Sequence, residues 1–120
     1  MAWVVSFFDE FEEEFATFSD AVQDALLARA GLLEREGPQL GRPHADTLKG
    51  SKHGQMKELR FRADDGVWRV AFAFDPNRQA ILLVAGDKSG GSEKCFYRRL
   101  IAKADARFDR HLDRQNGRQA

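Results

Sequence analysis

Apolar and polar positions change their spacing several times along the first 54 residues. Residues 3–7 (Trp-Val-Val-Ser-Phe) are β-branched and aromatic and are followed by acids, which predicts a short strand. Phenylalanines then recur every three or four positions up to Phe18, which predicts an amphipathic helix. Ser19 can cap a second helix that ends at Gly37-Pro38. We expect these two helices to form a hairpin that packs onto a sheet.

Residues 38–54 show no periodic pattern of apolar positions, whereas apolar and polar positions alternate in the segment that follows. Residues 38–54 contain five glycines and prolines, so we predict a surface loop. From Met56 apolar and polar residues alternate, with Glu58 and Arg60 on one face and Lys57 on the other. Turn residues at 64–66 and 75–78 then separate three strands, the last two at 67–74 and 79–86. Short connections of this kind predict an antiparallel meander.

The last apolar pattern is helical and ends before the chain does. Ser92 can cap a helix in which apolar residues repeat every four positions from Phe96 to Leu112. Residues 113–120 have no apolar anchor, so we expect a frayed tail. The fold class is therefore α+β. A single domain at 1–112 is predicted to contain a short N-terminal strand, a helical hairpin, a three-stranded antiparallel meander and a C-terminal helix.

Composition supports one globular domain that stays in the cytoplasm. The 120 residues are 42% hydrophobic and 32% charged, and no apolar run is long enough to span a membrane. The N-terminus turns acidic where a signal peptide needs a basic start. The single cysteine, Cys95, cannot form an internal disulfide, and we expect a buried side chain there. No metal or nucleotide motif is present, so we expect no metal and no cofactor.

The net charge of zero conceals a strong asymmetry. Residues 1–36 contain nine acids and two bases, whereas residues 37–120 contain ten acids and seventeen bases. This division indicates a face that binds a polyanion, and ordinary solvation of exposed faces is the alternative. Bases gather on the predicted loop, on two adjacent strands and after the third: Lys49, Lys52, His53, Lys57, Arg60, Arg62, Arg69 and Lys88. The last helix carries more, on faces that we expect to be exposed: Arg98, Arg99, Lys103, Arg107 and Arg110.

Two of these bases also have structural interpretations. Arg60 can neutralise Glu58 or another acid across the sheet. Lys57 can discourage edge-to-edge pairing of strands. Tyr97, near the start of the last helix, is more readily explained by helix packing than by catalysis.

Several segments together resemble one family of proteins. The chain looks like the RelE/ParE superfamily of toxins, and within it the HigB-like, phage-related branch. The resemblance covers about residues 2–112. It depends on the segments LGRPHADTLKGSKHGQMKELRF, WRVAFAF, ILLVAGDKSG and FYRRLIAKADARFDRHL.

The resemblance implies a type II toxin: a ribosome-dependent endoribonuclease that cleaves messenger RNA and is inhibited by a helix-turn-helix antitoxin in a heteromeric complex. Arg60 and Arg69 match the family's strand arginines and would bind the scissile phosphate. Lys88 matches the basic residue after the last strand. Lys57 and His53 are the candidate bases. Contacts to RNA would come from Lys49, Lys52, Arg62, Arg98, Lys103 and Arg107.

One departure from the family pattern keeps other functions open. Many members of this branch carry two lysines after the last strand, whereas here Asp87 precedes a single Lys88. A ParE-like inhibitor of DNA gyrase would act through protein contact and would need no phosphate-binding cluster. A member without catalytic activity that only binds an antitoxin is the third possibility.

Overall fold

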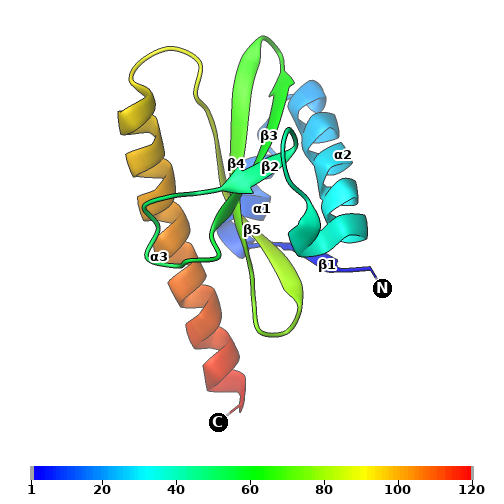
Figure 1. Cartoon of the computed structure of the whole chain (residues 1–120), viewed down its shortest axis with the longest axis vertical. Coiled ribbons are helices and arrows are strands. Elements are labelled where there is room, and N and C mark those ends of the chain that lie inside the picture. Colours follow the sequence, from blue (N-terminus) through cyan, green and yellow to red (C-terminus); the bar gives the residue numbers. More distant parts are fainter. Residues whose placement is uncertain (1, 120) are drawn as a thin grey trace.

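Five strands form one mixed sheet in the computed structural model, which describes residues 2–119, with side chains as far as residue 117. The order across the sheet is β1-β5-β4-β3-β2 (Figure 1). β1 runs parallel to β5, and the other pairs are antiparallel, so the predicted meander is confirmed as β3-β4-β5. The strands are β1 (Val4–Phe7), β2 (Ala45–Thr47), β3 (Lys57–Ala63), β4 (Gly66–Phe74) and β5 (Gln79–Asp87).

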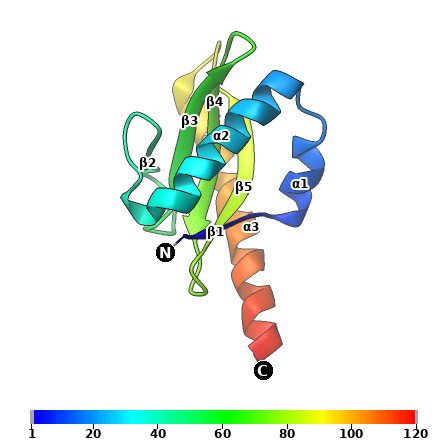
Figure 2. The ribbon, with the colours of Figure 1, turned by 90° about the vertical axis from the view of Figure 1, so that its right-hand side faces the viewer.

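Three helices pack against this sheet. α2 (Asp20–Glu36) lies on one face and α3 (Glu93–Gln119) lies on the other, whereas α1 (Asp9–Phe15) lies beside β5 at the edge of the sheet, as Figure 2 shows. Alternation along the strands separates the two faces. Phe61 and Trp68 face the α2 side, where the Trp68 ring lies 5.1 Å from that of Phe18. None of the helices in the described part of the chain is long and apolar enough to cross a membrane.

The predicted limits of α2 are correct, and both have a local cause. The hydroxyl of Ser19 accepts a hydrogen bond from the backbone N–H of Val22, as an N-cap does. Gly37 ends the helix with φ of 57°, a conformation that favours glycine. A Cβ at Gly37 would also lie 2.3 Å from the indole of Trp3. This glycine is therefore required both by its backbone conformation and by its packing against the chain that leads into β1.

The prediction of a surface loop at residues 38–54 is wrong for its middle part. A 3-10 turn at Gly37–Gln39 is followed by β2, which pairs antiparallel with β3. Leu40, Ala45 and Leu48 are buried in the core. A three-residue strand is too short to show an alternating period, and its pairing comes from a neighbour that the local pattern does not reveal.

Two predictions near the C-terminus also need correction. α3 continues through the expected frayed tail as far as Gln119, and residue 120 lies outside the described residues. This extension has polar anchors, because His111 and the side-chain amide of Gln115 hydrogen-bond Asp75 in the β4–β5 turn, at 2.8 and 2.6 Å. Cys95, which was expected to be buried, is exposed on the first turns of α3.

A β-bulge in β5 is stabilised by an arginine of α3. Ala71 pairs with Val84 and Phe72 with Leu82, so that Leu83 is the extra residue on its strand. The Leu83 carbonyl accepts a hydrogen bond of 2.7 Å from Nη1 of Arg107. The same guanidinium donates to both carboxylate oxygens of Glu14 in α1. Arg107 therefore joins β5, α1 and α3. The prediction that its side chain is exposed is wrong, because the residue is buried.

We predict that Arg107→Met will lower the free energy of unfolding by about 1.5–3 kcal/mol, the usual contribution of hydrogen bonds to a charged group. The reason is that the Leu83 carbonyl and Glu14 lose their donor. Urea unfolding followed by circular dichroism measures the change. Lys94→Ala, at an exposed position of the same helix, is the control and should stay within about 0.5 kcal/mol of wild type. Equal unfolding midpoints for the two variants would contradict the structural role of Arg107.

Candidate active site

The register of the sheet brings together two of the predicted site residues. Arg60 of β3 lies directly opposite Arg69 of β4, and both side chains point to the α3 face. Arg69 is almost fully buried, whereas the side chain of Arg60 is 30% exposed. Like charges directly opposite each other destabilise a sheet, so this pair requires compensation from its surroundings.

Glu58 supplies that compensation. Its side chain is 6% exposed, with Oε1 at 3.6 Å from Nε of Arg69 and Oε2 at 3.8 Å from Nε of Arg60. A carboxylate oxygen of Asp46 on β2 lies 3.9 Å from Nη1 of Arg60. The interpretation that Arg60 neutralises Glu58 or another acid therefore describes a real contact, although the distances are those of loose ion pairs.

Tyr97 of α3 completes the cluster from the opposite layer. Its hydroxyl donates to Oε1 of Glu58 at 2.9 Å and accepts from Nε of Arg69 at 3.1 Å. Arg69 also donates from Nη1 to the backbone carbonyl of Trp68. The tyrosine thus does more than pack the helix, because it fixes the positions of both charged partners.

Lys88 lies at the rim of this cluster. Its Nζ is 5.9 Å from the centre of the Tyr97 ring and donates to Oε1 of Glu93 at 2.6 Å. Asp87 does not contact Lys88 through its side chain, but accepts hydrogen bonds from Val67 and Ser89 and so holds the turn after β5. We name the group formed by Glu58, Arg60, Arg69, Lys88 and Tyr97 the arginine cluster.

Burial and hydrogen bonding set the protonation of three groups in and beside the arginine cluster. Burial raises the pKa of Glu58, against the opposing effects of the Tyr97 hydroxyl and the two arginines. Burial likewise raises the pKa of Tyr97, which keeps its phenol protonated. The hydrogen bond from Lys88 lowers the pKa of Glu93. The cluster therefore holds a hydrogen-bonded carboxyl group between cations.

Other residues predicted for the site lie elsewhere. Lys57 points to the opposite face of the sheet, where its Nζ donates to the carbonyl of Pro38. His53 and Lys52 both contact Asp109 of α3. Asp109 follows Tyr97 by twelve residues, a separation of about 18 Å along a helix. The two candidate bases, Lys57 and His53, are thus not part of the arginine cluster.

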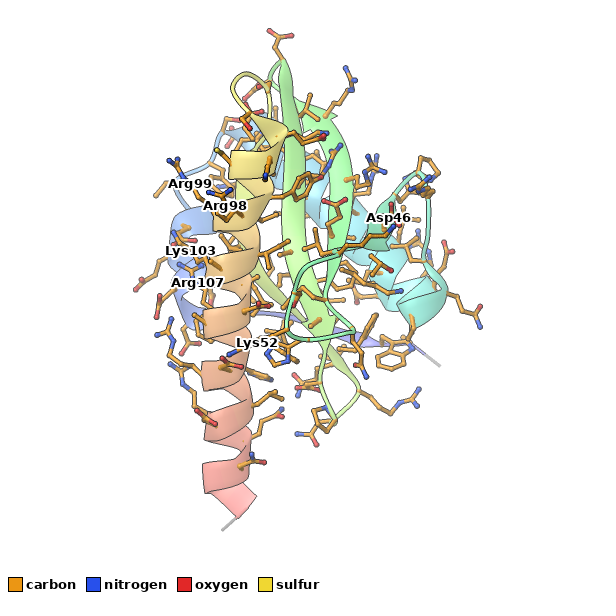
Figure 3. All side chains as sticks on the ribbon, turned by 60° about the vertical axis from the view of Figure 1, so that its left-hand side comes forward. Asp46, Lys52, Arg98, Arg99, Lys103 and Arg107 are labelled. Atoms are coloured by element: carbon orange, nitrogen blue, oxygen red, sulfur yellow. The ribbon has the colours of Figure 1, made fainter. Side chains whose placement is uncertain are left out.

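The predicted RNA contacts divide into free and engaged side chains. Arg107 is engaged in the bulge contact described above, so it is unavailable to a ligand. Lys49, Arg62, Arg98 and Lys103 are exposed, and Arg62 shares the α3 face of β3 with Arg60. In Figure 3, Arg99, Lys103 and Arg107 follow the side of α3 nearer α1, whereas Asp46 lies across the sheet.

The cluster has the chemistry of a phosphate site. Nε and Nη1 of Arg69 are engaged by protein acceptors, which leaves its second amino group, Nη2, without a hydrogen bond in the described part of the chain. The guanidinium of Arg60 makes no hydrogen bond within the described part of the chain, so its donors are available. Arginine forks match phosphate oxygens in pairs. Sequence analysis missed Glu58 and Tyr97 as members because only the β3–β4 register and the docking of α3 bring them to the arginines.

Comparisons with known proteins agree with this architecture. The family model described as "Phage derived protein Gp49-like (DUF891)" matches residues 13–109. The chain belongs to this family. It is 46% identical over 90 residues to the putative toxin HigB2 of Mycobacterium tuberculosis. The aligned region covers 74% of this chain but only 44% of that protein. The chain is 45% identical over 98 residues to the putative toxin HigB3 of the same organism, covering 79% of this chain and 83% of that protein.

A solved structure shows the same fold. The Gp49-like chain matches a mutant of the E. coli toxin RelE in the free state, with a TM-score of 0.60 at 13% identity. The match covers 86% of this chain and 97% of that one. The predicted resemblance to the RelE/ParE superfamily and its HigB-like branch is confirmed, and the chain belongs among toxins of the RelE/HigB type.

The raised pKa of Glu58 predicts a specific dependence of stability on pH. The folded chain holds this proton above the ordinary pKa of 4.5, so the stabilisation is full below that value and is lost as pH rises through the folded pKa. Glu58→Gln keeps an acceptor for Tyr97 but cannot ionise. Relative to this variant, wild type should therefore lose stability as the pH rises from below 4.5 through the raised pKa of Glu58.

Urea unfolding of both proteins across this pH range measures the difference. Glu12→Gln, an exposed carboxylate of α1, controls for the removal of one charge. Stability curves of wild type and Glu58→Gln that stay parallel across the range would contradict the assignment.

Proposed function

We propose that the chain is the toxin of a type II toxin–antitoxin module and acts as a ribosome-dependent endoribonuclease on messenger RNA. The observation that carries this proposal is the pairing of Arg60 with Arg69 around the buried Glu58. Holding two arginines side by side is unfavourable for folding, and a doubly charged phosphorane is the species that such a pair stabilises best. Membership of the Gp49-like family and the similarity to HigB2 and HigB3 support the toxin role.

In the proposed reaction the 2′-hydroxyl of the RNA attacks the adjacent phosphorus. The O2′–P bond forms and the P–O5′ bond breaks, which leaves a 2′,3′-cyclic phosphate and a 5′-hydroxyl end. Arg60 and Arg69 bind the non-bridging oxygens and stabilise the charge that develops on them. Glu58 accepts the proton of the 2′-hydroxyl, since burial brings its pKa closer to that of an effective base. Lys88 donates a proton to the departing 5′-oxygen, which gives the 5′-hydroxyl end.

The proposed partners follow from the same surface. Arg62 lies beside Arg60 on the α3 face, and Arg98 is exposed one residue after Tyr97. We assign both to contacts with RNA in the ribosome, where phosphates attract arginine. A helix-turn-helix antitoxin is the expected inhibitor. Gyrase inhibition through protein contact would give no role to the arginine cluster.

Inducible expression followed by sequencing of mRNA 5′ ends tests the reaction. Wild type should arrest growth and produce new 5′-hydroxyl ends within translated messages. Arg60→Ala should lower cleavage by about 100-fold or more, the usual effect of removing one donor that stabilises a developing oxyanion. Circular dichroism of the purified variant shows whether it is folded.

Arg35→Ala is the matched control, because Arg35 is exposed on α2, on the opposite side of the sheet. It should cleave as wild type does. Growth arrest without new mRNA ends would contradict the nuclease, and arrest with altered DNA supercoiling would favour gyrase inhibition. Absence of arrest would favour a member that only binds an antitoxin.

A further inference from the structure

An arginine interrupts the apolar stripe by which α2 packs onto the sheet. Arg29 lies between Leu26 and Leu33, which share its side of the helix and are fully buried. The residues three or four positions from Arg29 that flank it on this side are all apolar: Ala25, Leu26, Leu32 and Leu33. None of them can pair with its charge, and Arg29 forms no ion pair in the part of the chain that the structure describes. Packing alone does not explain a cation at this position.

The guanidinium of Arg29 reaches the main chain of β3. Its Nε donates a hydrogen bond of 3.1 Å to the backbone carbonyl of Arg60. α2 lies along β3, as Figure 2 shows, so this bond joins the helix to the strand that carries Arg60. A carbonyl that is shielded from water needs a donor of this kind. Arg29 is thus linked to the arginine cluster through the backbone, from the other face of the sheet.

The hydrogen-bond ladder between β2 and β3 ends at Arg60. The N–H of Arg60 donates to the His44 carbonyl at 2.8 Å, which is one half of an antiparallel pair. In a complete pair the N–H of His44 would donate in return to the Arg60 carbonyl, but it donates to the carbonyl of Gly41 at 3.0 Å instead. Arg29 takes the place of this missing donor. Strand pairing therefore supplies one backbone bond of Arg60, and α2 supplies the other.

The side chain of Arg60 has little support of its own. Its guanidinium forms no hydrogen bond with the described residues, and the carboxylate oxygens of Glu58 and Asp46 lie 3.8 and 3.9 Å from its nitrogens. Arg69, by contrast, is held by the Tyr97 hydroxyl and a backbone carbonyl. Arg60 also lies directly opposite Arg69, and like charges in this arrangement repel each other. The position of the Arg60 guanidinium therefore depends on how firmly its main chain is held.

We propose that Arg29 is a positioning residue for Arg60. It bonds the Arg60 carbonyl from α2 and so holds the Arg60 side chain beside Arg69, in the geometry that binds the scissile phosphate. Arg29 itself does not contact the RNA. The inference deepens the proposed function, and its consequence for catalysis rests on that function. Its consequence for geometry, a fixed Arg60 guanidinium, is measurable without any cleavage.

A purely structural role for Arg29 is the alternative. In that case the hydrogen bond would stabilise the fold, and its loss would affect cleavage only through the fraction of folded chain. The two roles differ in their coupling to Arg60. A positioning residue loses its effect when the side chain that it positions is removed, whereas a smaller folded fraction lowers activity in either background.

A double-mutant cycle, measured as cleavage of a message on purified ribosomes, tests this coupling. Arg29→Met should lower the cleavage rate about tenfold, in line with the loss of one hydrogen bond from a charged group. In the Arg60→Ala background the same change should lower the rate less than about twofold. Arg29→Lys, which keeps a charged donor, should cleave faster than Arg29→Met. Arg35→Met removes the other arginine of α2, which is exposed, and should cleave as wild type does.

NMR spectra of the labelled chain report the position of the Arg60 side chain itself. The Nε–Hε signal of Arg60 is identified by its loss in Arg60→Ala. Arg29→Met should shift this signal and lower its heteronuclear NOE, because the guanidinium becomes more mobile. Arg35→Met should leave both unchanged. Circular dichroism should show both variants folded, since one hydrogen bond is a small part of the stability of a domain.

Each possible result decides between the two proposals. An unchanged Arg60 signal in Arg29→Met would overturn the positioning role, and so would a tenfold loss of cleavage that persists in the Arg60→Ala background. Cleavage by Arg29→Met at the wild-type rate would also overturn it and leave the nuclease intact. If wild type cleaves no message but Arg29→Met shifts the Arg60 signal, the nuclease proposal fails and the positioning role stands.

Discussion

The burial of one carboxylate between two arginines is the constraint on which the rest of the site depends. Arg60 and Arg69 face each other across β3 and β4, and Glu58 lies between them with 5% of its surface exposed. A buried charge needs both partners and hydrogen bonds. Tyr97 provides the missing hydrogen bond, so α3 must cross this part of the sheet. The position of a whole helix is thereby coupled to the geometry of the arginine cluster.

Part of the charge asymmetry of the chain is used in ion pairs between two of its own helices, which the counts of acids and bases do not reveal. Acids of α1 pair with arginines in the C-terminal half of α3: Asp9 with Arg114, Glu10 with Arg110, and Glu14 with Arg107. The acids of α1 therefore hold the last helix against the sheet. Arg98, Arg99 and Lys103, in the N-terminal half of the helix, have no such partners in the described structure, which leaves cations free at one end of the molecule.

The candidate site could be predicted in part. Arg60, Arg69 and Lys88 were identified from strand pattern and family resemblance, and the structure brings them together. Lys57 and His53 are the candidate bases that the family resemblance adds to them. Because side chains alternate along β3, Lys57 points to the face of the sheet opposite Arg60, where it contacts Pro38. His53 hydrogen-bonds Asp109 of α3, far along the helix from Tyr97. Proximity along a strand is a poor guide to shared function, because successive side chains point in opposite directions.

The meander, the limits of α2 and the faces of β3 could be predicted from local patterns, since periods, caps and turn residues are local properties. Packing was needed to establish that β2 pairs with β3, that α3 continues past Leu112, and that Arg107 is buried. Each of these features depends on a residue far away in the sequence. Ala45 of β2 pairs with Leu59 of β3, Gln115 of α3 hydrogen-bonds Asp75, and Arg107 donates to the Leu83 carbonyl. Local patterns encode which face of an element is apolar. The partner that meets each polar group is selected only when the layers pack.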